Sequence, residues 1–136
     1  MGMSDKDSKQ GPSLDVPEHL QYSQDHVWID TSSSPAVIGI TEYAASELGD
    51  LVFVDLPETG GKVEAGDEVV ELESSKAVEP LVSPVSGTIS YVNHDAAEDP
   101  SIINNDPYGE GWILKVELDD DEPELLDAEE YAKAIH

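Results

Sequence analysis

The chain of 136 residues contains no cysteine and no arginine. Without cysteine it cannot form a disulfide, present a thiolate nucleophile or hold a metal through sulfur, so any sulfur redox chemistry has to come from an attached group. Six lysines face 31 acidic residues, which gives a formal net charge of −25. Because phosphate binding needs clustered lysine and arginine, this balance excludes nucleic acid as a partner. The same charge balance argues against binding to anionic membrane surfaces.

Long apolar runs are missing as well. No stretch approaches the ~18 apolar residues of a membrane span. Residues 1–15 are polar, lack the apolar segment of a secretory signal and are too acidic for a mitochondrial transit peptide. We therefore expect a cytoplasmic protein with a disordered lead over residues 1–15 and one domain over residues 16–136.

From Leu20 onward, short apolar or alternating segments are separated at close intervals by glycine, proline and serine. Such spacing is typical of a small antiparallel barrel or sandwich with about seven strands. Prolines at 80 and 84 favour an edge strand on that side. The expected strand segments are 22–30, which forms one strand-like stretch, 36–40, 51–56, 68–74, 81–82, 88–93 and 112–118. A brief segment, 62–65, lies between two of them.

Helices are expected at three places. Thr41 has the character of an N-cap and Gly49 that of a C-terminal stop, which predicts a short helix over residues 42–48. Asp127 and Glu130 form a capping-box pattern that opens a C-terminal helix ending near Ile135. One helical turn is expected between Pro100 and Asn104.

Lys76 stands out by its position in the sequence. It interrupts two strand-like arms, with Gly66 ten residues before it and Gly87 eleven residues after it. An ordinary lysine is protonated and a poor nucleophile, but at the tip of a hairpin it can serve as an attachment point. The alternative is a solvated lysine in a turn. The other lysines of the presumed domain lie in no such symmetric pair of strands; they are Lys62, Lys115 and Lys133.

The histidines predict no metal site, since they are scattered and lack ligand spacing. They are His19, His26, His94 and His136.

The core Glu73-Ser74-Ser75-Lys76-Ala77 and the downstream Ser83-Pro84-Val85-Ser86-Gly87 resemble the attachment hairpin of lipoyl and biotinyl carriers. Biotin carriers usually have methionine on both sides of the lysine, which this chain lacks. An ordered set of further motifs, spread over residues 16–135, resembles the glycine cleavage system H proteins. These motifs are Tyr22 with His26-Val27-Trp28, Gly39-Ile40-Thr41, Leu48-Gly49-Asp50, and segments 52–57, 105–112 and 124–127.

This resemblance implies a mainly β fold, the lipoyl/biotinyl-type barrel-sandwich hybrid of two small antiparallel sheets with short inserted and C-terminal helices. It implies a non-catalytic lipoyl carrier of the glycine cleavage system, with lipoate held in amide linkage on Lys76. The residues expected to mark the attachment lysine for recognition are Glu73, Ser74, Ser75, Ala77, Gly66 and Gly87.

The resemblance also implies a set of partner enzymes. A pyridoxal-phosphate-dependent glycine decarboxylase (P protein) would load an aminomethyl group, and an aminomethyltransferase (T protein) would pass the one-carbon unit to tetrahydrofolate. Dihydrolipoamide dehydrogenase (L protein) would reoxidise the arm, and a lipoate ligase or lipoyl transferase would attach it. We expect the carrier itself to be a monomer, because its charge opposes self-association.

The chain departs from the family in the cleft that receives the loaded arm. Val27 stands where the family usually has glutamate, and Pro80 stands where it often has an acid. We interpret Asp25 and Glu79 as the replacements. The expected docking residues are Asp25, His26, Trp28 and Glu79.

Two alternatives stay open. One is a lipoyl-relay protein of the same fold, which donates lipoate to other carriers. The other is an unmodified β-rich binding module. Aminomethyl loading by the decarboxylase would separate the first from a glycine cleavage carrier, and a mass gain at Lys76 would separate the second.

The spread of acidic residues along the whole chain predicts a salt-adapted protein. Screening shortens from about 8 Å at physiological salt to about 3 Å at 1 M, so molar salt suppresses the self-repulsion of such a surface. Circular dichroism recorded against salt concentration should show the fold weakened in dilute buffer and restored at high salt. A fold fully retained in dilute buffer would instead indicate an ordinary acidic carrier with basic partners.

Overall fold

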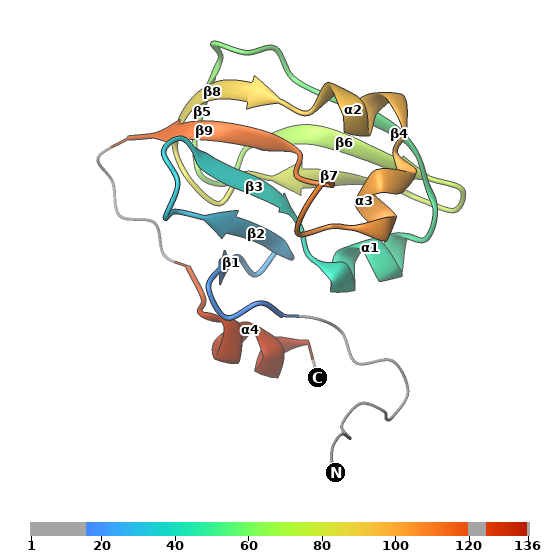
Figure 1. Cartoon of the computed structure of the whole chain (residues 1–136), viewed down its shortest axis with the longest axis horizontal. Helices are drawn as coiled ribbons and strands as arrows, with labels where there is room; N and C mark the ends of the chain where they lie inside the picture. The colour runs from blue at the N-terminus through green and yellow to red at the C-terminus, as the bar shows by residue number, and fades with distance from the viewer. Residues whose placement is uncertain (1–15, 120–124, 136) are drawn as a thin grey trace.

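The computed structural model describes residues 16–119 and 125–135, and the expected lead over residues 1–15 lies outside this part of the chain (Figure 1). Two antiparallel sheets make up the fold, a six-stranded sheet in the order β1-β2-β3-β9-β8-β5 and a three-stranded sheet in the order β4-β6-β7. The mainly β, two-sheet architecture with short helices is therefore confirmed. The strands are β1 (Gln21–Tyr22), β2 (Val27–Asp30), β3 (Ala36–Ile40), β4 (Leu51–Asp55), β5 (Lys62–Val63), β6 (Glu68–Ser74), β7 (Val78–Val82), β8 (Gly87–Val92) and β9 (Leu114–Leu118).

The core forms where alternating side chains turn inward. Along β6, Val70 and Leu72 are buried while Glu71 and Glu73 are exposed, which is the period of two expected for a strand with one solvated face. Ile38 of β3 and Leu81 of β7 belong to the same apolar cluster. Burial of these side chains is the main favourable term in folding, since apolar surface leaves water.

The stretch 22–30, expected as one strand-like run, is in fact two strands joined by a tight turn, so that prediction was wrong. The Ser23 N–H donates to the carbonyl of Val27 at 2.9 Å, and the Ser23 hydroxyl accepts from the backbone N–H groups of Asp25 and Val27. His26 takes a left-handed backbone with φ of 66°. The side-chain bonds of Ser23 close the turn, and alternation alone does not register them.

The predicted ends of the first and last helices are confirmed. Thr41 caps α1 (Glu42–Leu48) by accepting from the Ala44 N–H, and Gly49 follows it with φ of 81°. Asp127 and Glu130 complete a capping box at the start of α4 (Ala128–Ala134). Both signals are local pairs of residues, and that is why the sequence carries them.

Between β8 and β9, where one helical turn was expected, the chain forms two helices, α2 (His94–Glu98) and α3 (Ser101–Asn105). Asn93 accounts for the additional helix. Its side-chain oxygen accepts from the N–H groups of Asp95 and Ala96, and its side-chain amide donates to the carbonyls of Glu110 and Trp112. The cap thus also ties α2 to the loop that leads into β9.

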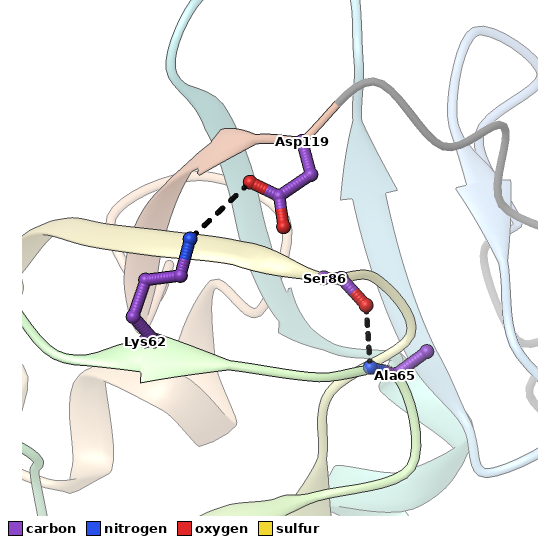
Figure 2. A network of polar contacts seen from close by, with 4 residues as sticks. All are labelled: Lys62, Ala65, Ser86 and Asp119. Atoms are coloured by element: carbon purple, nitrogen blue, oxygen red, sulfur yellow. Dashed lines mark hydrogen bonds and ion pairs between the residues drawn. The ribbon is translucent and has the colours of Figure 1, made fainter.

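The edge strands of the six-stranded sheet, β1 and β5, have two residues each. β7, which contains Pro80, is an edge of the three-stranded sheet, as the prolines predicted. At the edge of the larger sheet, Lys62 of β5 pairs with Asp119 at 3.6 Å, and the Ala65 N–H donates to the Ser86 hydroxyl at 3.0 Å (Figure 2). The ion pair is exposed and adds little stability, but the contacts tie the β5 edge to the segments that flank β8 and β9.

Candidate functional site

Lys76 lies in the turn of the β6–β7 hairpin, in which Glu73 of β6 pairs with Val78 of β7. Ser74 closes this turn. Its N–H donates to the Ala77 carbonyl at 2.8 Å, and its hydroxyl accepts from the N–H groups of Lys76 and Ala77 at 3.2 and 3.0 Å. The N–H groups of Ser74, Lys76 and Ala77 are therefore satisfied within the turn, while the Lys76 side chain is exposed.

A second segment supports the turn from the side. The Ser75 N–H donates to the Asp50 carbonyl at 3.2 Å. A Cβ at Gly49 would lie 3.5 Å from Cε of Lys76, so the lysine side chain passes over this glycine. The lysine turn and the 49–50 segment thus form one packed unit.

Asn104 of α3 holds that segment in place. Its side-chain amide donates to the Gly49 carbonyl at 2.8 Å, and its side-chain oxygen accepts from the Leu51 N–H at 2.8 Å. Sequence reasoning missed Asn104, which lies 28 positions beyond Lys76 in the chain. No local pattern connects the two, and only the tertiary packing brings them to one site.

The other lysines of the described residues have different surroundings. Lys62 pairs with Asp119, and the Lys115 ammonium lies 4.9 Å from the centre of the Trp112 ring and 5.6 Å from that of Tyr91. Lys133 is part of helix α4. Among the lysines of the described residues, Lys76 is therefore the one that lies in a hairpin turn.

The predicted recognition glycines have structural roles in this fold. Gly66 has a backbone φ of 98°, which L side chains rarely adopt. A Cβ at Gly87 would collide with the Glu117 carbonyl oxygen of the paired strand β9. Gly66 thus shapes the turn before β6, and Gly87 allows β8 to approach β9 closely. Glu73 and Ser75 are exposed beside the lysine, and Ala77 is half-buried.

A cavity of about 340 Å³ opens beside Lys76, and we call it the hairpin cleft. The β1–β2 turn, β3, α1 and the β6–β7 hairpin each contribute part of its wall. Apolar side chains line much of it, while three carboxylates add negative charge. The lining residues are Asp25, His26, Val27, Ile40, Tyr43, Ala44, Glu47, Leu48, Leu72, Ala77, Glu79, Pro80 and Leu81.

Of the four expected docking residues, three lie together in the hairpin cleft: Asp25, His26 and Glu79. Trp28 lies elsewhere. It is 2% exposed, and its indole N–H donates to the Pro107 carbonyl at 2.9 Å, so it is a core residue of a second apolar cluster. Asp25 lies in the β1–β2 turn, and strand alternation therefore does not set its direction.

Glu47 is a cleft residue that the sequence reasoning did not single out. It follows Tyr43 by four positions on α1, so both side chains share one face of the helix, and both line the cleft. Val27 and Pro80 also line the cleft. The cavity thus combines apolar side chains with acidic groups.

His26 is held from behind by Tyr131 of α4. The distance from Nδ1 of His26 to the Tyr131 hydroxyl is 2.9 Å, and the hydroxyl lies 2.7 Å from Oγ1 of Thr41. Burial raises the pKa of Tyr131 to about 12, so this hydroxyl keeps its proton at physiological pH.

Within the described ranges, no group of three or more histidine, aspartate or glutamate side chains is arranged to hold a metal ion. Each helix in those ranges also falls short of the length and apolar character that a membrane crossing requires.

A two-sheet β domain that presents one lysine on a hairpin turn has the architecture of the lipoyl-type barrel-sandwich. The family model of the glycine cleavage H-protein matches residues 20–136, and the chain belongs to this family. It is 68% identical over 136 residues to the glycine cleavage system H protein of Bifidobacterium longum, covering 99% of each chain. It is 48% identical to that of Rubrobacter xylanophilus, covering 89% of this chain and 95% of the relative.

A solved structure supports the same assignment. The crystal structure of a glycine cleavage system H protein from Mycobacterium marinum superposes with a TM-score of 0.81 at 45% identity, covering 87% of this chain and 97% of that one.

Replacing Ser74 by alanine should loosen the lysine turn. The Lys76 and Ala77 N–H groups lose their acceptor, and a hydrogen bond of this kind contributes about 1 kcal/mol. Amide hydrogen exchange at these two positions should accelerate roughly fivefold, while the core strands keep their protection. Ser75→Ala is the matched control, since the Ser75 hydroxyl takes no part in these bonds; equal effects of both variants would contradict the role given to Ser74.

Proposed function

We propose that this chain is the lipoyl carrier of a glycine cleavage system, with lipoate in amide linkage to Lys76 and no catalytic step of its own. The observation that carries the proposal is the exposed Lys76 side chain in a closed hairpin turn, next to the hairpin cleft. When attached, the dithiolane of lipoate would accept the aminomethyl group and carry the redox chemistry, which a chain without cysteine cannot supply.

The residues present fit such a group. Lys76 offers an amine that can be acylated, and the turn that holds it has its backbone bonds satisfied by Ser74. A cavity of about 340 Å³ lies within the usual range for small-molecule sites. Its apolar wall, which includes Val27 and Leu72, suits the hydrocarbon part of a lipoyl arm.

The carboxylates of the hairpin cleft have a role in the same proposal. The aminomethyl group carries an amine that is cationic at neutral pH, and Asp25, Glu47 and Glu79 would stabilise it electrostatically. We infer that they replace the acids missing at positions 27 and 80. The role of the chain's own residues is then to orient the loaded arm and to limit its contact with water.

The partners we propose are the P protein, the T protein, the L protein, and a lipoate ligase or lipoyl transferase. Phe53 and Val78 lie across Glu73 from each other in register and are 50% and 53% exposed, so they offer apolar contact area beside Lys76. The charge of −25 suits partners with basic rims, because complementary potentials favour encounter. We also propose that the protein acts in the cytoplasm as a monomer and that its acidic surface is adapted to high salt.

Lys76 should be the position that gains lipoate. Intact mass after incubation with lipoate ligase and lipoate should rise by one lipoyl group in the unaltered chain and in the control Lys133→Arg, but not in Lys76→Arg. Glycine breakdown with the P, T and L proteins should fall to background in Lys76→Arg alone. Undiminished glycine breakdown in that variant would refute the proposal, and lipoylation without aminomethyl loading would favour the relay alternative.

Neutralising the cleft carboxylates should weaken retention of the loaded arm. A carboxylate near a solvated cation contributes roughly 0.5–1 kcal/mol, so the triple variant Asp25→Asn, Glu47→Gln, Glu79→Gln should release the aminomethyl group roughly tenfold faster. The measurement is the rate of amine release from the loaded carrier without T protein or folate. Glu71→Gln is the control, because Glu71 is exposed on the same hairpin and does not line the cleft. Equal release rates in the two variants would exclude the carboxylates from arm binding.

A further inference from the structure

Tyr131 links the C-terminal helix to the hairpin cleft. Its side chain is 1% exposed, and its ring stacks on Tyr22 with centroids 4.7 Å apart and an interplanar angle of 9°. Its hydroxyl contacts two polar groups, Nδ1 of His26 at 2.9 Å and Oγ1 of Thr41 at 2.7 Å. His26 lines the cleft, whereas Tyr131 and Thr41 do not.

The hydrogens of this buried group can be assigned by accounting for donors and acceptors. The Thr41 hydroxyl accepts from the Ala44 N–H at 3.2 Å as the cap of α1, and Thr41 is fully buried. The hydrogen of the Thr41 hydroxyl needs an acceptor. Among the described residues, the other side-chain group within hydrogen-bond distance of this hydroxyl is the Tyr131 oxygen. Thr41 therefore donates to Tyr131. The single hydrogen of the Tyr131 hydroxyl, which that phenol retains, then goes to Nδ1 of His26.

This order of donors determines the tautomer of the imidazole. An Nδ1 that accepts a hydrogen bond carries no proton, so the neutral His26 ring is protonated at Nε2. Protonation at Nδ1 would require both hydroxyls to reverse and would leave the buried Thr41 hydrogen without its acceptor, which is costly.

The ring and backbone of His26 are also fixed from other sides. The ring packs against Tyr43 with centroids 4.7 Å apart, and the His26 carbonyl accepts from the Thr41 N–H at 3.0 Å. The left-handed backbone of the residue, with φ of 66°, places the side chain at the end of the β1–β2 turn. His26 is thus held by α1, by the α1 cap residue Thr41 and by α4.

We infer that Tyr131 is a positioning residue, which through Thr41 and His26 gives the hairpin cleft an Nε2–H donor for an acyl group carried on Lys76. The identity of the group that this donor binds rests on the proposed function, but the tautomer follows from the contacts of the unmodified chain alone. The donor complements the carboxylates of the cleft, which accept hydrogen bonds and cannot donate one.

The tautomer can be measured on the unmodified full chain by ¹⁵N NMR with ring-labelled histidine, at about pH 9, where neutral imidazole predominates. His26 should show a proton on Nε2 and a hydrogen-bonded, unprotonated Nδ1. A proton on Nδ1 would overturn the inference. This measurement needs no lipoate, so it stands or fails separately from the proposed function.

Two matched variants test the role of the hydroxyl. Tyr131→Phe keeps the ring on Tyr22 but removes the bond to Nδ1, so His26 should exchange between both tautomers. Tyr43→Phe removes a hydroxyl from the other tyrosine that touches the same ring, and it should retain the single tautomer. A single Nε2–H tautomer in a folded Tyr131→Phe variant would exclude the positioning role; if that variant fails to fold, the tautomer of the unaltered chain decides.

The occupant is tested on the lipoylated chain. Acylation of Lys76 should shift the His26 Nε2–H resonance in the unaltered protein, and Tyr131→Phe should lose most of that shift. A lipoylated chain with an unchanged His26 resonance would overturn the assignment of the acyl group as the partner of this donor. A chain that cannot be lipoylated would refute the proposed function and leave the tautomer result intact.

Discussion

The site depends on one constraint: a lysine has to stay exposed in a turn whose backbone polar groups are nevertheless satisfied. Ser74 meets it with its own N–H and hydroxyl, which bond Lys76 and Ala77. The Asp50 carbonyl then accepts from Ser75, and Asn104 fixes the segment that carries Asp50. A flexible side chain is thereby attached to a rigid base, so its reach is set by the lysine and by whatever it carries rather than by movement of the hairpin.

Charge acts on the same site over a longer range. The chain carries a net charge of −25, yet the hairpin cleft combines its carboxylates with apolar walls from Val27, Leu72 and Leu81. The general negative potential attracts any cation to the molecule, and it is the local geometry of the cleft that can select one. Val27 and Pro80 are apolar positions of the wall, and Glu47 and Glu79 supply charge at others. Charge in a solvated cleft can act from several positions because its effect falls off gradually with distance.

Much of the fold followed from local patterns. The helix caps at Thr41 and Asp127 and the alternation along β6 are interactions between near neighbours, and these predictions were confirmed. The failures have a common cause. Each missed feature depends on one polar side chain. The Ser23 hydroxyl closes the β1–β2 turn, while tertiary packing sets the distant partners of Asn93 and Asn104. Trp28 is the converse case, since its place beside His26 in sequence gave no information about its indole, which points to Pro107 in the core.

The C-terminal helix shows how a distant element can take part in the site without touching its occupant. α4 packs by Tyr131 against Tyr22, and the same residue contacts His26 through its hydroxyl. A carboxylate on the cleft wall can exert its effect from several positions, but a hydrogen-bond donor works only at a fixed distance and direction. The donor therefore needs a rigid support behind it, and a buried tyrosine with a raised pKa provides that support without adding charge to the core. This difference explains why the histidine is fixed by α1, by the cap residue Thr41 and by α4, whereas the carboxylates of the cleft need no such support.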